Sequence, residues 1–214
     1  MTIVPGGMFR MLLCRRRFLA LVSGLTTLPM LATAQAATEN DADGFVRGLG
    51  SDAIRVLSNK SLDETQREDE FRRILLKGFD VDRISRFVLG RFWRQATEGQ
   101  RIEYRRLFED YVVKAYALRL GEYSGETFVV RDARPAEDGD VVVYSEIDRT
   151  NGPPVRVEWR CRKTSDGYKI TDVVVEGVSM ALTQRQEFAS VIQNGGGNVS
   201  VLLDQLRKKT AGDK

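Results

Sequence analysis

The chain has no histidine among its 214 residues. Histidine is the usual general base near neutral pH, so its absence excludes Ser-His-Asp and Cys-His hydrolases and metal sites built on imidazole. The stretch "GVSMA", residues 177 to 181, resembles a nucleophile elbow, but no residue can take the proton from Ser179 as a histidine would. We therefore interpret Ser179 as a helix N-cap and find no catalytic constellation.

Acidic residues are absent from the first 38 positions, where four arginines precede an apolar run from 18 to 31. Two Ala-x-Ala patterns follow within residues 32 to 36. This order is typical of an export signal, and the run is shorter than the roughly 20 residues that span a bilayer. We expect residues 1–37 to be a cleaved signal, with an uncleaved membrane anchor as the alternative. Arg15-Arg16 resembles a twin-arginine pair, and the general export route also fits.

Little net charge remains once this segment is removed. The 33 basic residues fall by four to 29 against 30 acidic ones, so the net charge becomes −1. Such a chain lacks the basic footprint of a nucleic-acid-binding protein. Cys161 is then the only cysteine, which excludes an intramolecular disulfide. Residues 38–214 contain no repeat or long linker, so we expect one domain. The export signal indicates a location in the bacterial periplasm, and we expect a monomer.

Apolar residues recur at helical spacing through the first half of this domain. Residues 38–44 are small and polar, and we expect them to be irregular. Helices are predicted over about 45–57, from Ser61 or Asp63 to Gly78, from Asp80 to Gly90, and from Thr97, which begins a capping box with Gln100. The last of these carries an unusually aromatic stripe.

The period changes from 3.6 to 2 after Thr127. Four strand-like runs are separated by turn sequences such as "EDG", "NGPP" and "SDG". In the third run Val155, Val157, Trp159 and Cys161 alternate with charged residues, so one sheet face is buried and one solvated. Two helices close the chain, one over about 183–193 and one after Gly197. The predicted class is α+β: N-terminal helices, a four-stranded antiparallel sheet and two C-terminal helices.

Two long blocks of this pattern resemble a known family. "LGRFWRQATEGQRIEYRRLFEDYVVKAYALRL" is followed by the β meander and by "YKITDVVVEGVSMALTQRQEFASVI". Leu89-Gly90 with Phe92-Trp93, and the segment 172–179 followed by Arg185 and Phe188, are the most specific parts. Over residues 45 to 208 the chain is similar to the toluene-tolerance, or MlaC, family of periplasmic phospholipid-binding proteins.

The resemblance implies a curved, MlaC-like and NTF2-like cone that encloses an apolar cavity. It implies a non-enzymatic shuttle that carries phospholipid between an outer-membrane Mla-type lipoprotein complex and an inner-membrane Mla-type ABC transporter, and so maintains outer-membrane lipid asymmetry. No cofactor and no metal are needed. A hopanoid-associated carrier of the same family, a ligand-free periplasmic adaptor, and a small enzyme using Asp172 as base are the alternatives.

Physical chemistry supports a carrier, because two acyl chains of about fifteen methylenes each represent on the order of 20 kcal/mol of burial. A sheet with one apolar face, closed by an aromatic helix, can supply the cavity. The same side chains could instead fill a dry core, and Asp172 could mark a bulge or an ion pair at the sheet rim. The predicted lining residues are Tyr104, Phe108, Tyr111, Val112, Val141, Val143, Val155, Val157, Trp159 and Val175.

Overall fold

The computed structural model describes residues 32–120 and 125–211. All of them belong to one unit, Leu31–Lys214. The predicted export segment, residues 1–37, lies outside the described residues except for its last six positions. Within the described ranges, no helix is both long enough and apolar enough to cross a bilayer.

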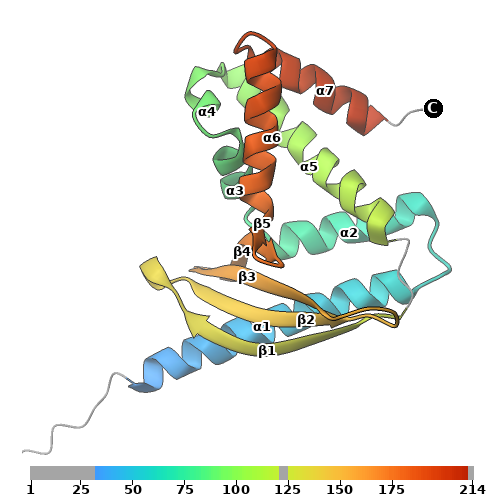
Figure 1. Ribbon diagram of the computed structural model, residues 1–214, viewed down its shortest axis with the longest axis vertical. Coiled ribbons are helices and arrows are strands. Elements are labelled where there is room, and N and C mark those ends of the chain that lie inside the picture. Colours follow the sequence, from blue (N-terminus) through green and yellow to red (C-terminus); the bar gives the residue numbers. More distant parts are fainter. Residues whose placement is uncertain (1–31, 121–124, 212–214) are drawn as a thin grey trace, which may run out of the picture. The chain divides into compact units, whose positions relative to one another are not determined.

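Helices flank the sheet in sequence on both sides, as predicted (Figure 1). A short 3₁₀ helix, Glu137–Gly139, connects the first two strands. The helices are α1 (Ala32–Ser58), α2 (Glu64–Gly78), α3 (Val81–Leu89), α4 (Phe92–Gln95), α5 (Glu98–Leu120), α6 (Met180–Asn194) and α7 (Val199–Ala211).

The sheet is antiparallel and its strands follow chain order, from β1 to β5. This confirms the α+β class but corrects the predicted strand count from four to five. The extra strand is two residues long. It forms because Glu176 (φ +49°) and Gly177 (φ +80°) turn the chain back, so that it pairs with Val174 and Val175. The strands are β1 (Thr127–Pro135), β2 (Val141–Asp148), β3 (Val155–Thr164), β4 (Gly167–Val175) and β5 (Val178–Ser179).

Capping residues set the start of several helices. Thr97 and Gln100 form the predicted capping box, with each backbone N–H donating to the other's side-chain oxygen. Asp63 and Gln66 form a second box before α2. The N-cap of α6 is Ser179, whose hydroxyl accepts from the Leu182 amide at 3.1 Å. The prediction for Ser179 is therefore confirmed.

Two predicted helix starts are wrong. The first C-terminal helix begins at Met180 rather than near Thr183, whose hydroxyl donates to the Ser179 carbonyl inside the first turn. The first helix already includes Ala32, the first described residue, so residues 38–44 are helical rather than irregular. Small polar residues such as those at 38–44 have modest helix propensity, and the helix continues through them.

Buried side chains form two clusters. The sheet cluster joins α1 and α2 to one face of the sheet. The helical cluster joins the five helices α3, α4, α5, α6 and α7 to one another. Buried residues of the sheet cluster are Ala42, Val46, Leu49, Val56, Ile74, Val130, Val141, Val143, Cys161, Tyr168 and Ile170. Those of the helical cluster are Val88, Leu89, Phe92, Ala96, Tyr104, Leu107, Phe108, Ala181, Phe188, Ile192, Val199, Leu202, Leu203 and Leu206.

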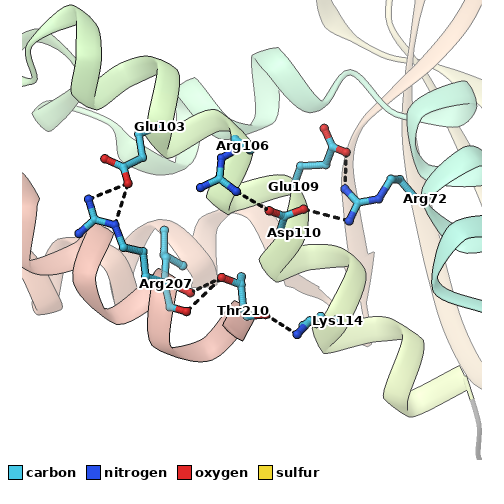
Figure 2. A network of polar contacts seen from close by, with 9 residues as sticks. Arg72, Glu103, Arg106, Glu109, Asp110, Lys114, Arg207 and Thr210 are labelled. Carbon is cyan, nitrogen blue, oxygen red and sulfur yellow. Dashed lines mark hydrogen bonds and ion pairs between the residues drawn. The ribbon is translucent and has the colours of Figure 1, made fainter. Parts of the chain in front are cut away.

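Polar contacts along α5 connect it to α2 and α7 (Figure 2). Arg72 of α2 donates to Glu109 at 2.5 Å and to Asp110 at 2.9 Å. On the other side, Arg207 of α7 donates to Glu103 at 2.7 Å, and Lys114 donates to the Thr210 carbonyl. Because α2 belongs to the sheet cluster, the Arg72 contacts hold the two clusters together.

Asp172 makes a second connection between the clusters, from the end of β4 to the start of α6. Its carboxylate accepts from the Ser179 hydroxyl at 2.7 Å and from the Ala181 amide at 3.1 Å. Arg160 lies 4.0 Å away, which gives the ion pair expected from the sequence. The strand register shifts beside this pair, so the predicted bulge is also present. Asp172 thus fixes the direction in which α6 leaves the sheet.

Replacing Asp172 by Ala should lower the free energy of unfolding by about 1–3 kcal/mol, because a half-buried hydroxyl and a helix N-terminal amide lose their acceptor. Urea titration followed by circular dichroism measures this. The matched control is Asp166→Ala in an exposed turn, with an expected change within about 0.5 kcal/mol. Equal effects of the two substitutions would show that the connection at Asp172 contributes nothing.

Candidate functional site

An apolar cavity of about 470 Å³ lies between α1, α2 and the sheet. Among its described lining residues, Glu126 alone has a charged side chain. The lining residues are Val46, Leu49, Gly50, Ala53, Ile54 and Leu57 of α1; Phe71, Ile74 and Leu75 of α2; Phe79, which follows α2; and Glu126, Phe128, Ile147 and Trp159 on the sheet side.

The helical wall follows from the spacing of apolar residues along α1. Val46, Leu49, Ala53 and Leu57 recur at three and four residues and so occupy one face of the helix. Leu49 also packs against the backbone of α2 at Gly78, where a Cβ would stand 2.6 Å from the leucine Cδ2. The two helices therefore approach closely beside the cavity.

Two aromatic rings form the sheet-side wall. Phe128 of β1 and Trp159 of β3 meet edge to face, with centroids 5.9 Å apart and an interplanar angle of 89°. The Trp159 Nε1–H donates to the Ser145 hydroxyl at 2.8 Å, and this hydroxyl donates to the Val157 carbonyl at 3.1 Å. Ser145 is only 3% exposed, so its hydroxyl satisfies the indole N–H within the sheet layer and holds the ring in place.

Gly50 sets the distance between α1 and this aromatic wall. A Cβ at Gly50 would stand 2.4 Å from Cδ1 of the Phe128 ring. Any side chain at this position would force the ring or the helix to move. The missing Cβ therefore allows Phe128 to lie directly against the helix backbone.

The six sheet residues predicted from the sequence share one face. Val143 pairs with Trp159, and Val157 pairs with Val175. Residues directly paired in an antiparallel ladder point to the same side, which also holds for Val141 and Val155 by alternation along their strands. Among these six residues, Trp159 lines the described cavity.

The four residues predicted from the long helix lie elsewhere, in the helical cluster. Tyr104 and Phe108 are buried there, and their rings contact Phe188 of α6 at centroid distances of 6.3 Å. Tyr111 and Val112 pack against the same cluster. The Tyr104 hydroxyl donates to the Ser85 carbonyl at 3.0 Å, and burial raises the pKa of Tyr104 well above its ordinary value.

The helical side of the cavity is absent from the predicted lining. The signal was present, because the apolar spacing of α1 and the run Phe71, Ile74 and Leu75 both mark buried helix faces. Periodicity shows that such a face is buried, but it does not show which element covers it.

Among the described lining residues, Glu126 is the only ionisable group, so no two such groups face the cavity together. Asp172, the only base considered from the sequence, is not among the lining residues and serves α6 instead. Cys161 is fully buried, and burial raises the pKa of its thiol to about 12. It is therefore a neutral, small apolar group at physiological pH, as the alternation predicted.

Replacing Ser145 by Ala should leave the indole N–H of Trp159 without its acceptor and lower the free energy of unfolding by about 1–3 kcal/mol. In a Trp93→Phe background, the fluorescence of Trp159 should also change because its ring is no longer held. Ser190→Ala, on an exposed position of α6, is the control. Unchanged emission and stability would show that the Ser145 hydroxyl does not position the ring.

The chain is similar to known proteins over most of its length. The sequence profile described as "MlaC protein" matches residues 49–208. The toluene tolerance protein ttg2D of Pseudomonas putida is 23% identical over 181 residues, which are 84% of each chain. The intermembrane phospholipid transport system binding protein MlaC of Haemophilus influenzae is 22% identical over 144 residues, 65% of this chain and 66% of that protein.

A solved structure shares the fold. It is the phospholipid-binding protein from Ralstonia solanacearum, determined in complex with a phospholipid. The TM-score is 0.71 at 27% identity, over 80% of this chain and 97% of that one. With the family profile matching well over half of its length, this chain belongs to the MlaC protein family.

Proposed function

We propose that this chain is a phospholipid carrier whose acyl-chain site is the cavity between α1, α2 and the sheet. The observation that carries the proposal is a partly open cavity with apolar walls and a single charged lining residue among those described. Such a space favours a hydrocarbon over any polar ligand, because a buried polar group needs hydrogen-bond partners.

The cavity volume fits one acyl chain. If a methylene takes up about the volume of a water molecule in the liquid, roughly 30 Å³, then 470 Å³ holds about fifteen methylenes. At about 0.8 kcal/mol per methylene, burying such a chain is worth on the order of 12 kcal/mol. That is enough to hold a lipid in water without any covalent or catalytic step, so the proposed carrier is not an enzyme and needs no cofactor.

Among the ten residues predicted from the sequence, we propose Trp159 as the direct acyl-chain contact. Val141, Val143, Val155, Val157 and Val175 extend the same apolar sheet face beside it. The α5 residues Tyr104, Phe108, Tyr111 and Val112 belong to the helical cluster, and any contact of theirs with lipid would require that cluster to open.

The cellular role proposed for the carrier rests on the sequence and on the relatives. Residues 1–37 are proposed to direct export and to be removed, which leaves residues 38–214 as a periplasmic lipid-binding domain. The relative from Haemophilus influenzae is named for intermembrane phospholipid transport. By analogy, we propose that this chain passes lipid between an outer-membrane Mla-type lipoprotein complex and an inner-membrane Mla-type ABC transporter, which would maintain outer-membrane asymmetry.

Replacing Ala53 by Trp should fill the cavity from its helical wall and reduce bound lipid at least fivefold. Native mass spectrometry of protein recovered from the periplasm without detergent, followed by organic extraction, measures the bound lipid. The control is Ile102→Trp, because Ile102 is 61% exposed on α5 and far in sequence from the lining residues. Circular dichroism verifies that both variants fold.

Stoichiometric phospholipid in the wild type and in I102W, with loss in A53W, is the expected result. A hopanoid adduct would keep the carrier and change its cargo. A folded A53W protein with full lipid content would place the site elsewhere. Wild-type protein that stays free of lipid after incubation with liposomes would overturn the proposed function.

A further inference from the structure

Five arginines on one part of the surface have no anionic partner. Among the described residues, no carboxylate forms an ion pair with Arg83, Arg86, Arg91, Arg94 or Arg185, and no acceptor takes a hydrogen bond from their guanidinium groups. Arg83 and Arg86 lie in α3. Arg91 lies just before α4, Arg94 lies within α4, and Arg185 lies in α6. α3 packs against α6 (Figure 1), and Arg185 contacts Phe87 and Gly90 of the α3 end, next to Arg91 in the sequence. We name these five arginines the arginine face.

The other arginines whose side chains the structure describes are engaged. Arg47, Arg131 and Arg162, for example, pair with carboxylates at 2.6–2.9 Å. Arg67 and Arg149 lack a carboxylate but donate to backbone carbonyls. The arginines without any such partner are therefore concentrated on the arginine face rather than scattered over the molecule.

Aromatic rings hold several of these guanidinium groups in place. Arg86 lies over Trp93 at 5.3 Å, and Arg91 lies over Phe92 at 4.9 Å. Arg185 lies over Phe87 at 4.9 Å. Such stacking limits the freedom of the side chain while leaving its N–H donors available in the plane of the guanidinium.

Gly90 fixes Arg185 from the other side. A Cβ at this position would stand 2.9 Å from the Arg185 Nε, and the glycine has φ +57°, which L-residues rarely adopt. The Arg185 guanidinium is thus packed between the Gly90 backbone and the Phe87 ring. Leu89-Gly90 and Arg185 are among the positions that carry the family resemblance, and neither lines the cavity.

Apolar side chains are exposed on the same surface. Phe87 is 44% exposed and Leu182 is 46% exposed. Leu182 lies three residues before Arg185 and so neighbours it on α6. Two acids on α3 and α5 are already paired: Asp82 with Arg105 at 3.4 Å, and Glu98 with Arg101 at 3.6 Å. Glu187 of α6 accepts a hydrogen bond from the Gln184 side chain.

We propose that the arginine face binds the surface of an anionic phospholipid bilayer. The guanidinium fork matches phosphate oxygens, and the entire basic content between Lys77 and Lys114 is arginine. Exposed Phe87 and Leu182 can enter the boundary between headgroups and acyl chains. A protein partner would need a carboxylate matched to each of five arginines, three of which aromatic rings hold in place, whereas a lipid surface supplies phosphates at any spacing. This surface is separate from the cavity and does not depend on the identity of the cargo.

The test is co-sedimentation with vesicles of phosphatidylcholine alone and of phosphatidylcholine mixed with phosphatidylglycerol, using protein as processed by the exporting cell. Wild type should bind only the anionic vesicles, and less at high salt. The variant R83Q/R91Q/R94Q should bind at least about tenfold more weakly. The control R55Q/R134Q/R156Q removes the same charge from exposed arginines of α1, β1 and β3 and should change binding less than about twofold.

A second variant, Leu182→Ser, tests the apolar contribution without removing a ring that holds an arginine, and it should also weaken binding. Bound lipid, measured by native mass spectrometry, should be the same in all variants, which separates this proposal from the proposed function. Absence of wild-type binding to anionic vesicles would overturn the proposal and leave an acidic protein surface as the partner of the arginine face. Equal losses in the two triple variants would also overturn it, because binding would then follow net charge alone.

Discussion

The cavity depends on the contact between the Phe128 ring and the backbone of α1 at Gly50. Because Gly50 has no Cβ, the ring lies directly against the helix and fixes how far α1 stands from β1. Phe128 in turn holds the edge of Trp159, and the Ser145 hydroxyl holds the indole from the sheet. The helix, two rings and one buried hydroxyl therefore determine the wall that a hydrocarbon chain would meet.

The separation of the core into two clusters explains how such a cavity can exist in a stable protein. The helical cluster is filled by aromatic and aliphatic side chains and needs no ligand. The sheet cluster lies around the cavity. Hydrogen bonds of Arg72 and Asp172 connect it to the helices of the helical cluster. In the proposed carrier, a lipid would leave this cavity without exposing the helical cluster.

The sequence was sufficient for the fold class and for many local details. Capping at Thr97 and Ser179, the irregular pairing next to Asp172 and the buried thiol of Cys161 all follow from local chemistry, and the structure confirms them. The short strand β5 could not be predicted, since it depends on a left-handed Glu176 before Gly177. The helical conformation of residues 38–44 was also missed, because they carry no apolar periodicity.

The site was harder to predict than the fold for a physical reason. Aromatic periodicity in α5 correctly marks a buried face. This face packs against Phe188 of α6 rather than against the sheet, and periodicity does not determine the packing partner. Glycine is unfavourable inside a helix, and Gly50 is explained only by the Phe128 ring, 78 residues later, which lies against it. Pairing of distant elements decides both cases, and local sequence does not encode it.

The most direct measurement is a crystal structure of the protein purified from the periplasm without detergent. The account predicts continuous acyl-chain density between α1, α2 and the sheet, in contact with Phe128 and Trp159. Density between the sheet and α5, or a cavity that stays empty in protein shown to carry lipid, would contradict it.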